Sequence, residues 1–365
     1  MKIECIKNSL SNALVKAEKI SGKNQTLPIL SSILLETKNS SLCIKATNLD
    51  IGLQITIPVK VSRSGSVAVP GNTLSGFVSN LSEDKNIVLE EKNGVLHVSS
   101  KGSVSLIKTI LGEDFPTLPQ PSGKNFKIPI KDLINGLKAV WYSCAVTGIK
   151  PELSSVYVYS DKNELVFVAT DSFRLAEQRI NTKKPFELEQ LLIPFKNTAE
   201  IIRLLDGVDG EILIEVDNSQ ISFTHEGLYL VSRTIDGNFP DYKQIIPKEV
   251  KTEALVLKQD LLQALKVANV FSDSFRQITF NLDPKKKKFE AVTRNPDVGE
   301  GVNEIEAILK GEELSISFNF KYIMDCLQAI TSDSITLSFS GLSKPLIIRG
   351  VSDQNFLYLV MPMNR

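Results

Sequence analysis

The stretch Leu165-Val166-Phe167-Val168-Ala169-Thr170 is an apolar run that ends in Ala-Thr, and the chain contains its counterpart twice more. The matching ends are Ala46-Thr47 and Val292-Thr293, each 123 residues away. A stretch with leucines four residues apart precedes each of them, at Leu10 and Leu14, Leu133 and Leu137, and Leu261 and Leu265. Self-similarity at a fixed period indicates repeated structural units. We therefore interpret the chain as three copies of one domain, whose repetition would generate a continuous surface.

Each copy follows one plan twice, in which a strand leads to a helix and then to further strands. The strand that opens the first copy carries Ile3 and Cys5. The helices that follow these opening strands carry apolar faces at helical spacing: Leu10, Leu14, Ala17 and Ile20; Leu133, Leu137, Val140 and Trp141; Leu261, Leu265, Ala268 and Phe271. For the strand that opens the third copy, the pattern allows either Ala254 and Val256 or Leu255 and Leu257 on the buried face.

The second half of each copy contains another helix, expected at Asn72–Leu81, Lys196–Leu205 and Phe320–Ile330. Many antiparallel strands with two helices per copy predict the α+β class. Two similar phrases, Asp114-Phe115-Pro116 and Asn238-Phe239-Pro240, close the first two copies and precede the proline-containing joins. We expect domains at 1–120, 121–247 and 248–365, held in a fixed relation because the joins are short.

The composition is that of an ordinary globular protein. Apolar residues make up 42% of the 365 residues, charged residues make up 23%, and 42 basic residues balance 42 acidic ones. The four cysteines form no CxxC pair, which is typical of small buried residues in a reducing compartment. The N-terminal residues lack the apolar core of a signal peptide, and no apolar run is long enough to cross a bilayer. We expect a cytoplasmic protein without a membrane association.

Charge is distributed unevenly between the six expected helices and the remainder of the chain. The helices carry ten basic residues and five acidic ones, so the remainder must carry the balancing negative charge. A positive surface without a base-reading motif is what sequence-independent contact with phosphates requires. The alternative is a set of amphipathic helices with ordinary solvated faces, and the threefold repeat favours the first interpretation. The basic residues are Lys7, Lys16, Lys19, Lys131, Lys138, Lys196, Arg203, Lys258, Lys266 and Lys321.

The sequence contains no recognisable catalytic pattern. His97 and His225 lie in alternating strand patterns and lack partners at metal-ligand spacing. Asp171 and Arg174 could form a catalytic ion pair, but a pair at the turn after a strand is the simpler interpretation. The run Lys285–Lys288 is interpreted as a solvated hairpin tip rather than a nucleic-acid patch. We therefore predict a protein that is not an enzyme, with no cofactor, no catalytic residues and no bound metal.

At this point the chain resembles the bacterial β sliding clamp, the β subunit of DNA polymerase III, over its whole length. Four segments carry the resemblance, in order: Thr26-Leu27-Pro28-Ile29-Leu30, Ala169-Thr170-Asp171-Ser172-Phe173-Arg174-Leu175-Ala176, Asn238-Phe239-Pro240-Asp241-Tyr242 and Leu359-Val360-Met361-Pro362-Met363. The resemblance implies a processivity factor for DNA replication, in which a head-to-tail homodimer closes a ring of six domains around duplex DNA. Helices would line the hole, sheets would form the outside, and Lys23 would join the helix cations in facing DNA.

The resemblance also implies partners: double-stranded DNA of any sequence, the polymerase III catalytic subunit, the clamp loader and other proteins with clamp-binding motifs. Short peptides would dock in one pocket between the second and third domains. By matched position its residues are Leu153, Thr170, Ser172, Phe173, Arg174, Leu175, Pro240, Ile245, Pro345, Val360, Met361, Pro362 and Met363. The dimer seam would join Ile107 and Lys108 on one edge to a second group on the other edge, namely Val270, Phe271, Glu300 and Glu304.

The chain departs from the family pattern in several places. Phe173 stands where the family usually has histidine, Gln244 where arginine is frequent, and Asn24 where a basic residue is common. Pocket shape and partner preference are therefore expected to differ from those of relatives. The alternative function is a clamp-like binding module that closes no ring.

Overall fold

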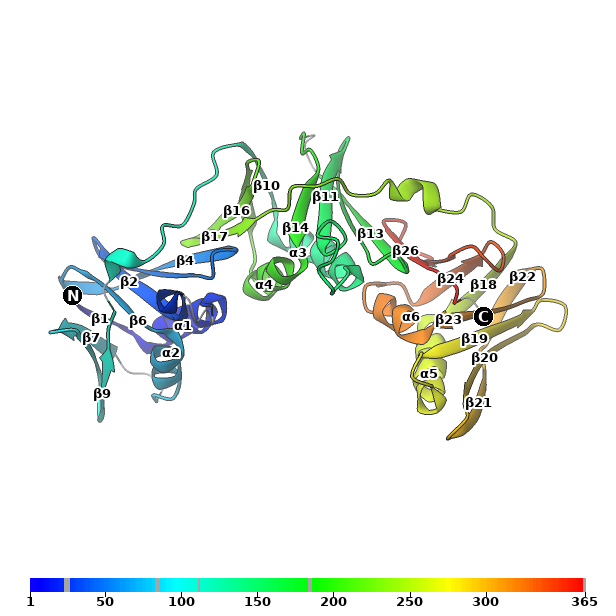
Figure 1. The fold of residues 1–365 in the computed structure, drawn as a ribbon, viewed down its shortest axis with the longest axis horizontal. Coiled ribbons are helices and arrows are strands. Elements are labelled where there is room, and N and C mark those ends of the chain that lie inside the picture. Colours follow the sequence, from blue (N-terminus) through cyan, green and yellow to red (C-terminus); the bar gives the residue numbers. More distant parts are fainter. Residues whose placement is uncertain (23–26, 83–85, 111, 183–185, 364–365) are drawn as a thin grey trace. The chain divides into compact units, whose positions relative to one another are not determined.

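The chain folds into two compact units, each built from two antiparallel sheets and short helices (Figure 1). The computed structural model describes residues 1–22, 27–82, 86–110, 112–182 and 186–363. One unit comprises Met1–Lys131 and Arg203–Thr234, and the other comprises Asp132–Ile202 and Ile235–Arg365. Each unit thus combines a terminal repeat with part of the middle repeat, because sheets continue across the joins between repeats.

Six α-helices stand where the repeat pattern predicts them. Their bounds are α1 Lys7–Ile20, α2 Gly71–Ser79, α3 Ile130–Val140, α4 Phe195–Leu205, α5 Lys258–Ala268 and α6 Phe320–Leu327. Short 3₁₀ turns follow α3 and α5, and they include the last predicted face residues, Trp141 and Phe271. The 3₁₀ segments are η1 Pro28–Ser31, η2 Gly112–Asp114, η3 Trp141–Ser143, η4 Tyr242–Ile245 and η5 Asn269–Phe271. Helix α6 ends three residues before the predicted Ile330.

In the first unit, α1 and α2 pack against each other beside a five-stranded and an eight-stranded sheet. The five-stranded sheet runs β5 (Lys60–Arg63), β1 (Lys2–Ile6), β7 (Asn86–Lys92), β8 (Val95–Ser100), β9 (Ser103–Lys108). The eight-stranded sheet runs β10 (Lys124–Pro129), β15 (Glu211–Val216), β16 (Gln220–His225), β17 (Leu228–Arg233), β4 (Ile51–Pro58), β3 (Ser41–Thr47), β2 (Ser32–Lys38), β6 (Ser66–Pro70). Pairing of β17 with β4 joins the first and second repeats in one sheet.

The second unit repeats this arrangement with a nine-stranded and a four-stranded sheet. The nine-stranded sheet runs β14 (Leu191–Pro194), β11 (Ser155–Asp161), β12 (Glu164–Thr170), β13 (Arg174–Asn181), β26 (Phe356–Val360), β25 (Leu346–Gly350), β24 (Ser334–Phe339), β18 (Thr252–Leu257), β22 (Ala307–Gly311). The four-stranded sheet runs β21 (Gly299–Glu304), β20 (Lys288–Asn295), β19 (Gln277–Asp283), β23 (Leu314–Asn319). Pairing of β13 with β26 joins the second and third repeats.

The predicted apolar faces are the core of each unit. Leu10, Leu14, Ala17 and Ile20 are each at most 1% exposed, as are Leu137, Leu261 and Leu265. The structure resolves the alternative for β18, because Ala254 and Val256 are buried while Leu257 is 52% exposed. The α+β prediction is confirmed. Lys285–Lys288 are exposed around the turn between β19 and β20, where Lys286 pairs with Asp283 at 2.9 Å, so the hairpin-tip interpretation is also confirmed.

Candidate functional site

A five-residue turn between β12 and β13 presents Phe173, the aromatic residue of the predicted peptide pocket. Thr170 Oγ1 accepts a hydrogen bond from Ser172 N at 3.2 Å and donates to Arg174 O at 2.6 Å. Asp171 Oδ1 accepts from the amides of Phe173 and Arg174, both at 3.0 Å. Ser172 adopts a positive φ of 78°, which reverses the chain. These bonds fix the turn, and Phe173 at its tip is 61% exposed.

The pairing of β13 with β26 brings this turn beside the end of the chain. Arg174 faces Val360 and Leu175 faces Leu359 in the register of the two strands. The amide of Met361 then donates to Phe173 O at 2.8 Å, which extends the pairing into the turn. We call the turn 170–174, the β13–β26 seam and the segment 238–246 above it the second junction. Most of the predicted pocket residues meet here.

Arg174 binds four groups from three separate parts of the second unit. Its side chain is 9% exposed, and its Nε and Nη1 atoms bind Asp171 Oδ2 at 2.9 Å and Asp325 Oδ2 at 2.7 Å. Its Nη2 atom donates to Tyr142 O at 2.6 Å, and the guanidinium lies 4.5 Å from the centre of the Tyr322 ring. Asp171 and Arg174 are therefore a structural ion pair at a turn, as the simpler interpretation held. The same arginine ties the turn to α6 through Asp325.

The segment 238–246, which we call the connector, is fastened to the outer face of the nine-stranded sheet. Tyr242 is 4% exposed and donates a short hydrogen bond from its hydroxyl to Glu177 Oε2 on β13. The Tyr159 hydroxyl lies 2.9 Å from that of Tyr242 and donates to it, since the Tyr242 proton is already given to the carboxylate. Arg179 Nε neutralises Glu177 at 2.7 Å. Burial, and then the charge of Glu177, raise the pKa of Tyr242 well above its ordinary value.

Aromatic stacking extends this attachment on both sides of Tyr242. The rings of Phe239 and Tyr157 stack with centroids 4.7 Å apart and an interplanar angle of 12°. Lys243 Nζ lies 5.6 Å from the centre of the Tyr159 ring. Tyr242 also packs on a buried apolar cluster of Val166, Val168, Leu175, Ile347, Leu357 and Leu359. The anchored residues leave Pro240 exposed and Ile245 49% exposed on the connector.

The remaining predicted pocket residues are placed by the same sheet. Pro345 is buried directly before Leu346, whose partner in the strand register is Val360. Met363 donates from its amide to Ser317 O at 2.8 Å, so the half-buried residues Met361 to Met363 run along β23. Leu153 is 7% exposed, and its carbonyl accepts from Ala145 N at 2.8 Å. The sequence did not indicate that Glu177, Tyr159 and Arg179 anchor the connector. It identified Tyr242 only as part of a segment typical of the family.

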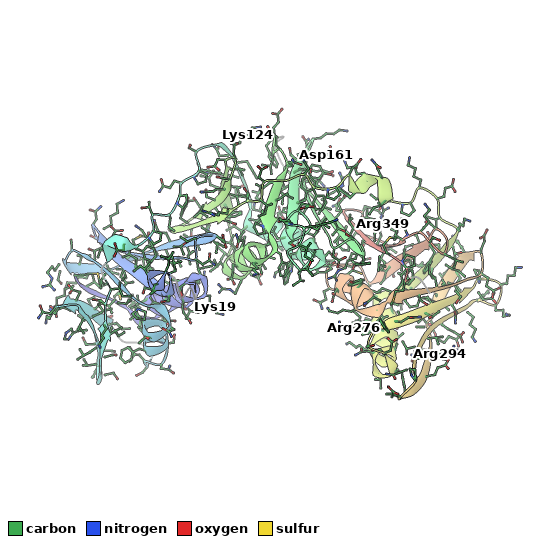
Figure 2. All side chains as sticks on the ribbon, viewed as in Figure 1. Lys19, Lys124, Asp161, Arg276, Arg294 and Arg349 are labelled. Carbon is green, nitrogen blue, oxygen red and sulfur yellow. The ribbon has the colours of Figure 1, made fainter. Side chains whose placement is uncertain are left out.

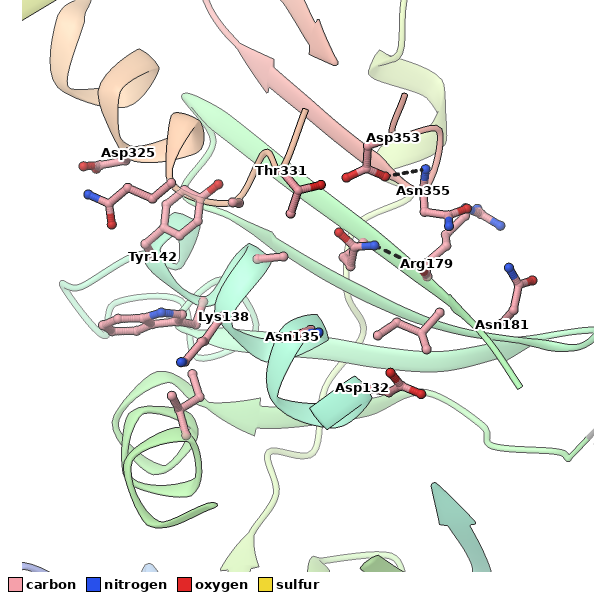
Figure 3. Close-up of a pocket in the computed structure, with 17 residues that line it drawn as sticks. Asp132, Asn135, Lys138, Tyr142, Arg179, Asn181, Asp325, Thr331, Asp353 and Asn355 are labelled. Carbon is pink, nitrogen blue, oxygen red and sulfur yellow. Dashed lines mark hydrogen bonds between the residues drawn. The ribbon is translucent and has the colours of Figure 1, made fainter. Parts of the chain in front are cut away.

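A polar cavity of about 810 Å³ lies in the same unit, beside α3 and the far end of β13 (Figure 3). Asp132, Asn135 and Lys138 reach it from α3, while Asp353 and Asn355 border it from the loop before β26. Its charged groups are largely committed to the protein. Asp325 binds Arg174 and Lys321, and Asp353 accepts from the amide of Asn355 at 3.1 Å. The cavity therefore has the character of a solvated groove.

The predicted DNA-facing cations differ in exposure. Figure 2 labels one of the exposed ones, Lys19. Lys23 lies outside the described residues. Lys7 is only 7% exposed, which contradicts the prediction that it faces DNA. It precedes Leu10 and Leu14 by three and seven residues and therefore shares their buried face. Lys258 occupies the equivalent place on α5 and donates to Ile330 O at 2.6 Å. Lys16 and Arg203 are half-buried, and the exposed set is Lys19, Lys131, Lys138, Lys196, Lys266 and Lys321.

In each unit, one sheet ends at a strand that pairs on one side only with the strands of the described residues. In the first unit this strand is β9, where Val104 is 70% exposed, Leu106 is 63% exposed and Lys108 is exposed. Ile107 is 4% exposed, so the strand alternation turns this predicted seam residue inward and Val104 and Leu106 outward. In the second unit the strand is β21, with Glu300 and Glu304 exposed and Val302 55% exposed.

Two further predicted seam residues stand beside β21. Val270 is 67% exposed, while Phe271 is half-buried. A Cβ at Gly301 would lie 2.7 Å from Phe271 Cδ2, so the glycine makes room for the phenylalanine ring on the strand. Each edge, considered within its own unit, offers apolar side chains next to backbone groups that no other described strand pairs with.

The two histidines lie on strands, and the four cysteines are buried. His225 Nδ1 lies 2.9 Å from Glu211 O in the eight-stranded sheet, and His97 faces Leu106 in the β8–β9 register. All four cysteines are buried, and burial raises the pKa of each thiol, to about 12 at Cys5. Among the described residues, no group of three or more His, Cys, Asp or Glu side chains is arranged to hold a metal ion. None of the described helices is long and apolar enough to cross a membrane.

Comparison with known proteins covers the chain from end to end. Three family models match in succession: the N-terminal domain of the DNA polymerase III beta subunit over 1–119, its central domain over 127–241 and its C-terminal domain over 243–364. The beta sliding clamp of Synechococcus elongatus is 28% identical over 371 residues, covering 100% of this chain and 99% of that protein. The beta sliding clamp of Bacillus subtilis is 27% identical over 376 residues with the same coverage.

Solved structures agree with this comparison. A sliding clamp of Pseudomonas aeruginosa bound to griselimycin superposes with a TM-score of 0.96 at 25% identity, and 100% of both chains is covered. The DNA polymerase sliding clamp of Bacillus subtilis gives a TM-score of 0.95 at 26% identity, covering 100% of this chain and 99% of that one.

Proposed function

We propose, because this chain belongs to the DNA polymerase III beta subunit family, that it works in DNA replication as a sliding clamp: a head-to-tail homodimer that encircles duplex DNA and tethers the polymerase to it. The observation that carries the proposal is the succession of three family domains, in order, over 1–364. The family is that of a non-catalytic accessory subunit, and we propose that this chain likewise has no catalytic site, needs no cofactor and acts in the cytoplasm.

We further propose that the three repeats, 1–120, 121–247 and 248–365, are the functional domains and that their helices face the DNA. The exposed cations, among them Lys19 on α1 and Lys266 on α5, would contact phosphates without reading bases. Such contacts are weakened by salt, because each one releases a condensed counterion. Retention therefore has to come from the closed ring rather than from affinity.

The ring predicts a specific outcome on topologically different substrates. The clamp loader places the clamp on nicked circular duplex DNA, and the complex is passed through a gel-filtration column at about 0.5 M salt, which screens the phosphate contacts. The clamp should remain bound to the DNA under these conditions. After a restriction enzyme linearises the same DNA, the clamp should slide off. Equal loss from circular and linear DNA would refute encirclement.

For closure of the ring, we propose that β9 of one protomer adds to β21 of the other. Val104 and Leu106 on β9 and Val270, Phe271 and Val302 at β21 supply apolar contacts, while Lys108 can pair with Glu300 or Glu304. The second candidate function, a clamp-like module that closes no ring, is separated by sedimentation of the parent and a Phe271→Asp variant. A dimeric parent and a monomeric variant support the ring, whereas two monomers at micromolar concentration support the open module.

For partner recruitment, we propose that the second junction binds short peptide motifs of the polymerase catalytic subunit, the clamp loader and other clamp-binding proteins. Phe173, Pro240 and Ile245 are exposed beside the β13–β26 seam, whose Leu175 and Val360 are buried beneath them. Met361 and Met363 are half-buried and flexible enough to fit several sequences. Deletion of residues 361–365 should abolish binding of a polymerase C-terminal peptide and leave the dimer intact. Unchanged peptide affinity would remove this site assignment.

A further inference from the structure

The turn at the second junction has a close copy in the first unit. Thr47 Oγ1 accepts from Leu49 N and donates to Ile51 O, both at 3.0 Å. Asn48 Oδ1 accepts from the amides of Asp50 and Ile51, both at 3.0 Å. Leu49 has a φ of 77°, against 78° at Ser172. The residues are 123 positions earlier than their counterparts, and the side-chain-to-backbone bonds are the same.

The strands around this turn are also repeated. Ile51 and Gly52 on β4 face Ser232 and Val231 on β17, just as Arg174 and Leu175 face Val360 and Leu359. Arg233 N donates to Asp50 O at 2.8 Å, which is the counterpart of the bond from Met361 N to Phe173 O. We call this turn, the β4–β17 seam and the segment 114–119 the first junction.

The two junctions differ in the side chains that fill them. Leu118 follows Pro116 by two residues, so it corresponds to Tyr242 after Pro240, and Gly52 corresponds to Leu175. A Cβ at Gly52 would lie 2.6 Å from Leu118 Cδ2, so Leu118 uses the space that Gly52 leaves open. The Tyr229 hydroxyl donates a short hydrogen bond to Pro119 O and holds the segment down. The first junction is therefore a partly filled version of the second.

A cavity of about 160 Å³ remains at the first junction. Apolar parts of Leu49, Pro116 and Val231 line it, together with the polar side chains of Asp50, Gln220 and Arg233. This volume is below the several hundred Å³ of a typical small-molecule site and suits one aliphatic side chain of a larger partner. Leu49 is 42% exposed, so the cavity opens to solvent at the turn.

Two polar groups at this cavity have no partner among the described residues. Gln220 Oε1 is buried without a hydrogen bond, which is a costly state for a carbonyl oxygen and one that an N–H donor would relieve. Arg233, the neighbour of Gln220 in the β16–β17 register, is exposed, and the ion pairs found among the described residues do not include it. An exposed guanidinium beside an unfilled acceptor is complementary to a carboxylate that follows a backbone amide.

We propose that the first junction is a second docking site, for a linear acidic peptide that inserts one small aliphatic side chain into the cavity, donates a backbone N–H to Gln220 Oε1 and pairs a carboxylate with Arg233. The comparison that suggests a peptide rests on the proposed function of the second junction, while the cavity and the two unsatisfied groups do not. Arg233 in the place of Met361 gives the first junction a preference for acidic partners, and Leu118 limits it to small side chains.

The test uses the full-length protein with labelled leucine and valine methyl groups and the probe N-acetyl-Asp-Val-Asp-amide. The probe should shift the methyl signals of Leu49 and Val231 and saturate. Arg233→Glu should weaken binding at least about tenfold, since an attractive charge pair becomes repulsive. The matched control is Lys127→Glu, the same charge change at an exposed position on β10 of the same sheet, and it should leave the affinity unchanged.

A second variant tests the role of Leu118. Leu118→Ala should enlarge the cavity and turn the preference toward a probe with leucine in place of valine. The proposal is overturned if the probe shifts the methyls of Leu175 and Val360 instead, or if Arg233→Glu and Lys127→Glu have equal effects. Binding of a polymerase peptide, followed at Leu175 and Val360, reports the second junction separately, so failure at either junction is visible without the other.

Discussion

Removal of one hydroxyl group, in Tyr242→Phe, tests whether the connector is held by its bond to Glu177. The hydroxyl donates to a carboxylate that is 6% exposed, and it accepts from Tyr159. Hydrogen bonds to charged groups contribute about 1.5–3 kcal/mol to stability. Removing the donor and leaving the buried carboxylate oxygen without it costs about the same free energy. Arg179 Nε, 2.7 Å from the other carboxylate oxygen, remains the ion-pair partner of Glu177 in the variant. The phenyl ring itself stays, so the apolar contacts of Tyr242 with Leu175 and Leu359 are retained.

We therefore expect the connector to open more readily by about 2 kcal/mol, which corresponds to roughly 30-fold faster amide exchange. Hydrogen–deuterium exchange of peptides covering 238–246, measured on the full-length protein, reports this opening directly. Exchange in the core of the same unit, for example in β12, should remain as in the parent. Affinity for a polymerase peptide should fall as well, because Pro240 and Ile245 are then presented less often in place.

The matched control is Tyr157→Phe. Tyr157 belongs to the same aromatic group and stacks on Phe239 at 4.7 Å, but no described residue receives a hydrogen bond from its hydroxyl. The control should therefore leave connector exchange within about twofold of the parent. Equal exchange of 238–246 in the parent, Tyr242→Phe and Tyr157→Phe would refute the reasoning, since stacking alone would then hold the connector.

Three further predictions concern other parts of the molecule. Arg174→Met strands the carboxylates of Asp171 and Asp325, so we expect a loss of about 3–5 kcal/mol, seen in urea unfolding of the second unit, with Arg294→Met as an exposed control. Burial raises the pKa of Tyr142, Tyr242 and Tyr358, so above pH 10 these tyrosines lose their protons in the unfolded chain before they do in the folded protein. The free energy of unfolding should therefore fall above pH 10, by up to about 1.4 kcal/mol per pH unit for each tyrosine. A free energy of unfolding that stays constant between about pH 9 and pH 11.5 contradicts this. Leu106→Asp should yield a folded monomer in sedimentation, whereas Ile107→Asp, at a 4% exposed position, should fail to fold; a dimeric Leu106→Asp protein would remove β9 from the seam.

The repeat made most of the fold predictable, because local patterns carry it. Helix faces such as Leu10 and Leu14, and strand faces such as Ala254 and Val256, follow from spacing alone. The structure differs from expectation at the ends of two elements. Lys7 is expected among the DNA-facing cations because of its charge, but its spacing from Leu10 places it on the buried face of α1. The resemblance places Ile107 at the dimer seam, but strand alternation turns Val104 and Leu106 outward instead.

The site was predictable only as far as single segments determine it. The turn 170–174 follows from Thr170 and Asp171, whose side chains hydrogen-bond to the backbone of the next residues in the turn. The partners across the sheet do not. Glu177 and Tyr242 are 65 residues apart, and Arg174 and Asp325 are 151 residues apart, so the strand register and the path of the connector decide that they meet. Composition and spacing contain no information about that register.

Repetition fixes the backbone of the two junctions, and the pairing of side chains across it decides what each junction can do. At the first junction Gly52 faces Leu118, and at the second Leu175 packs against Tyr242. In the first pair the connector residue settles onto bare backbone and closes most of the space. In the second pair Leu175 occupies the strand face, so Tyr242 of the connector packs on top of that side chain. The buried hydrogen bond from Tyr242 to Glu177 holds the connector in this position. The peptide site proposed for the second junction therefore depends on the anchored connector, whereas at the first junction Leu118 leaves only the small cavity of about 160 Å³.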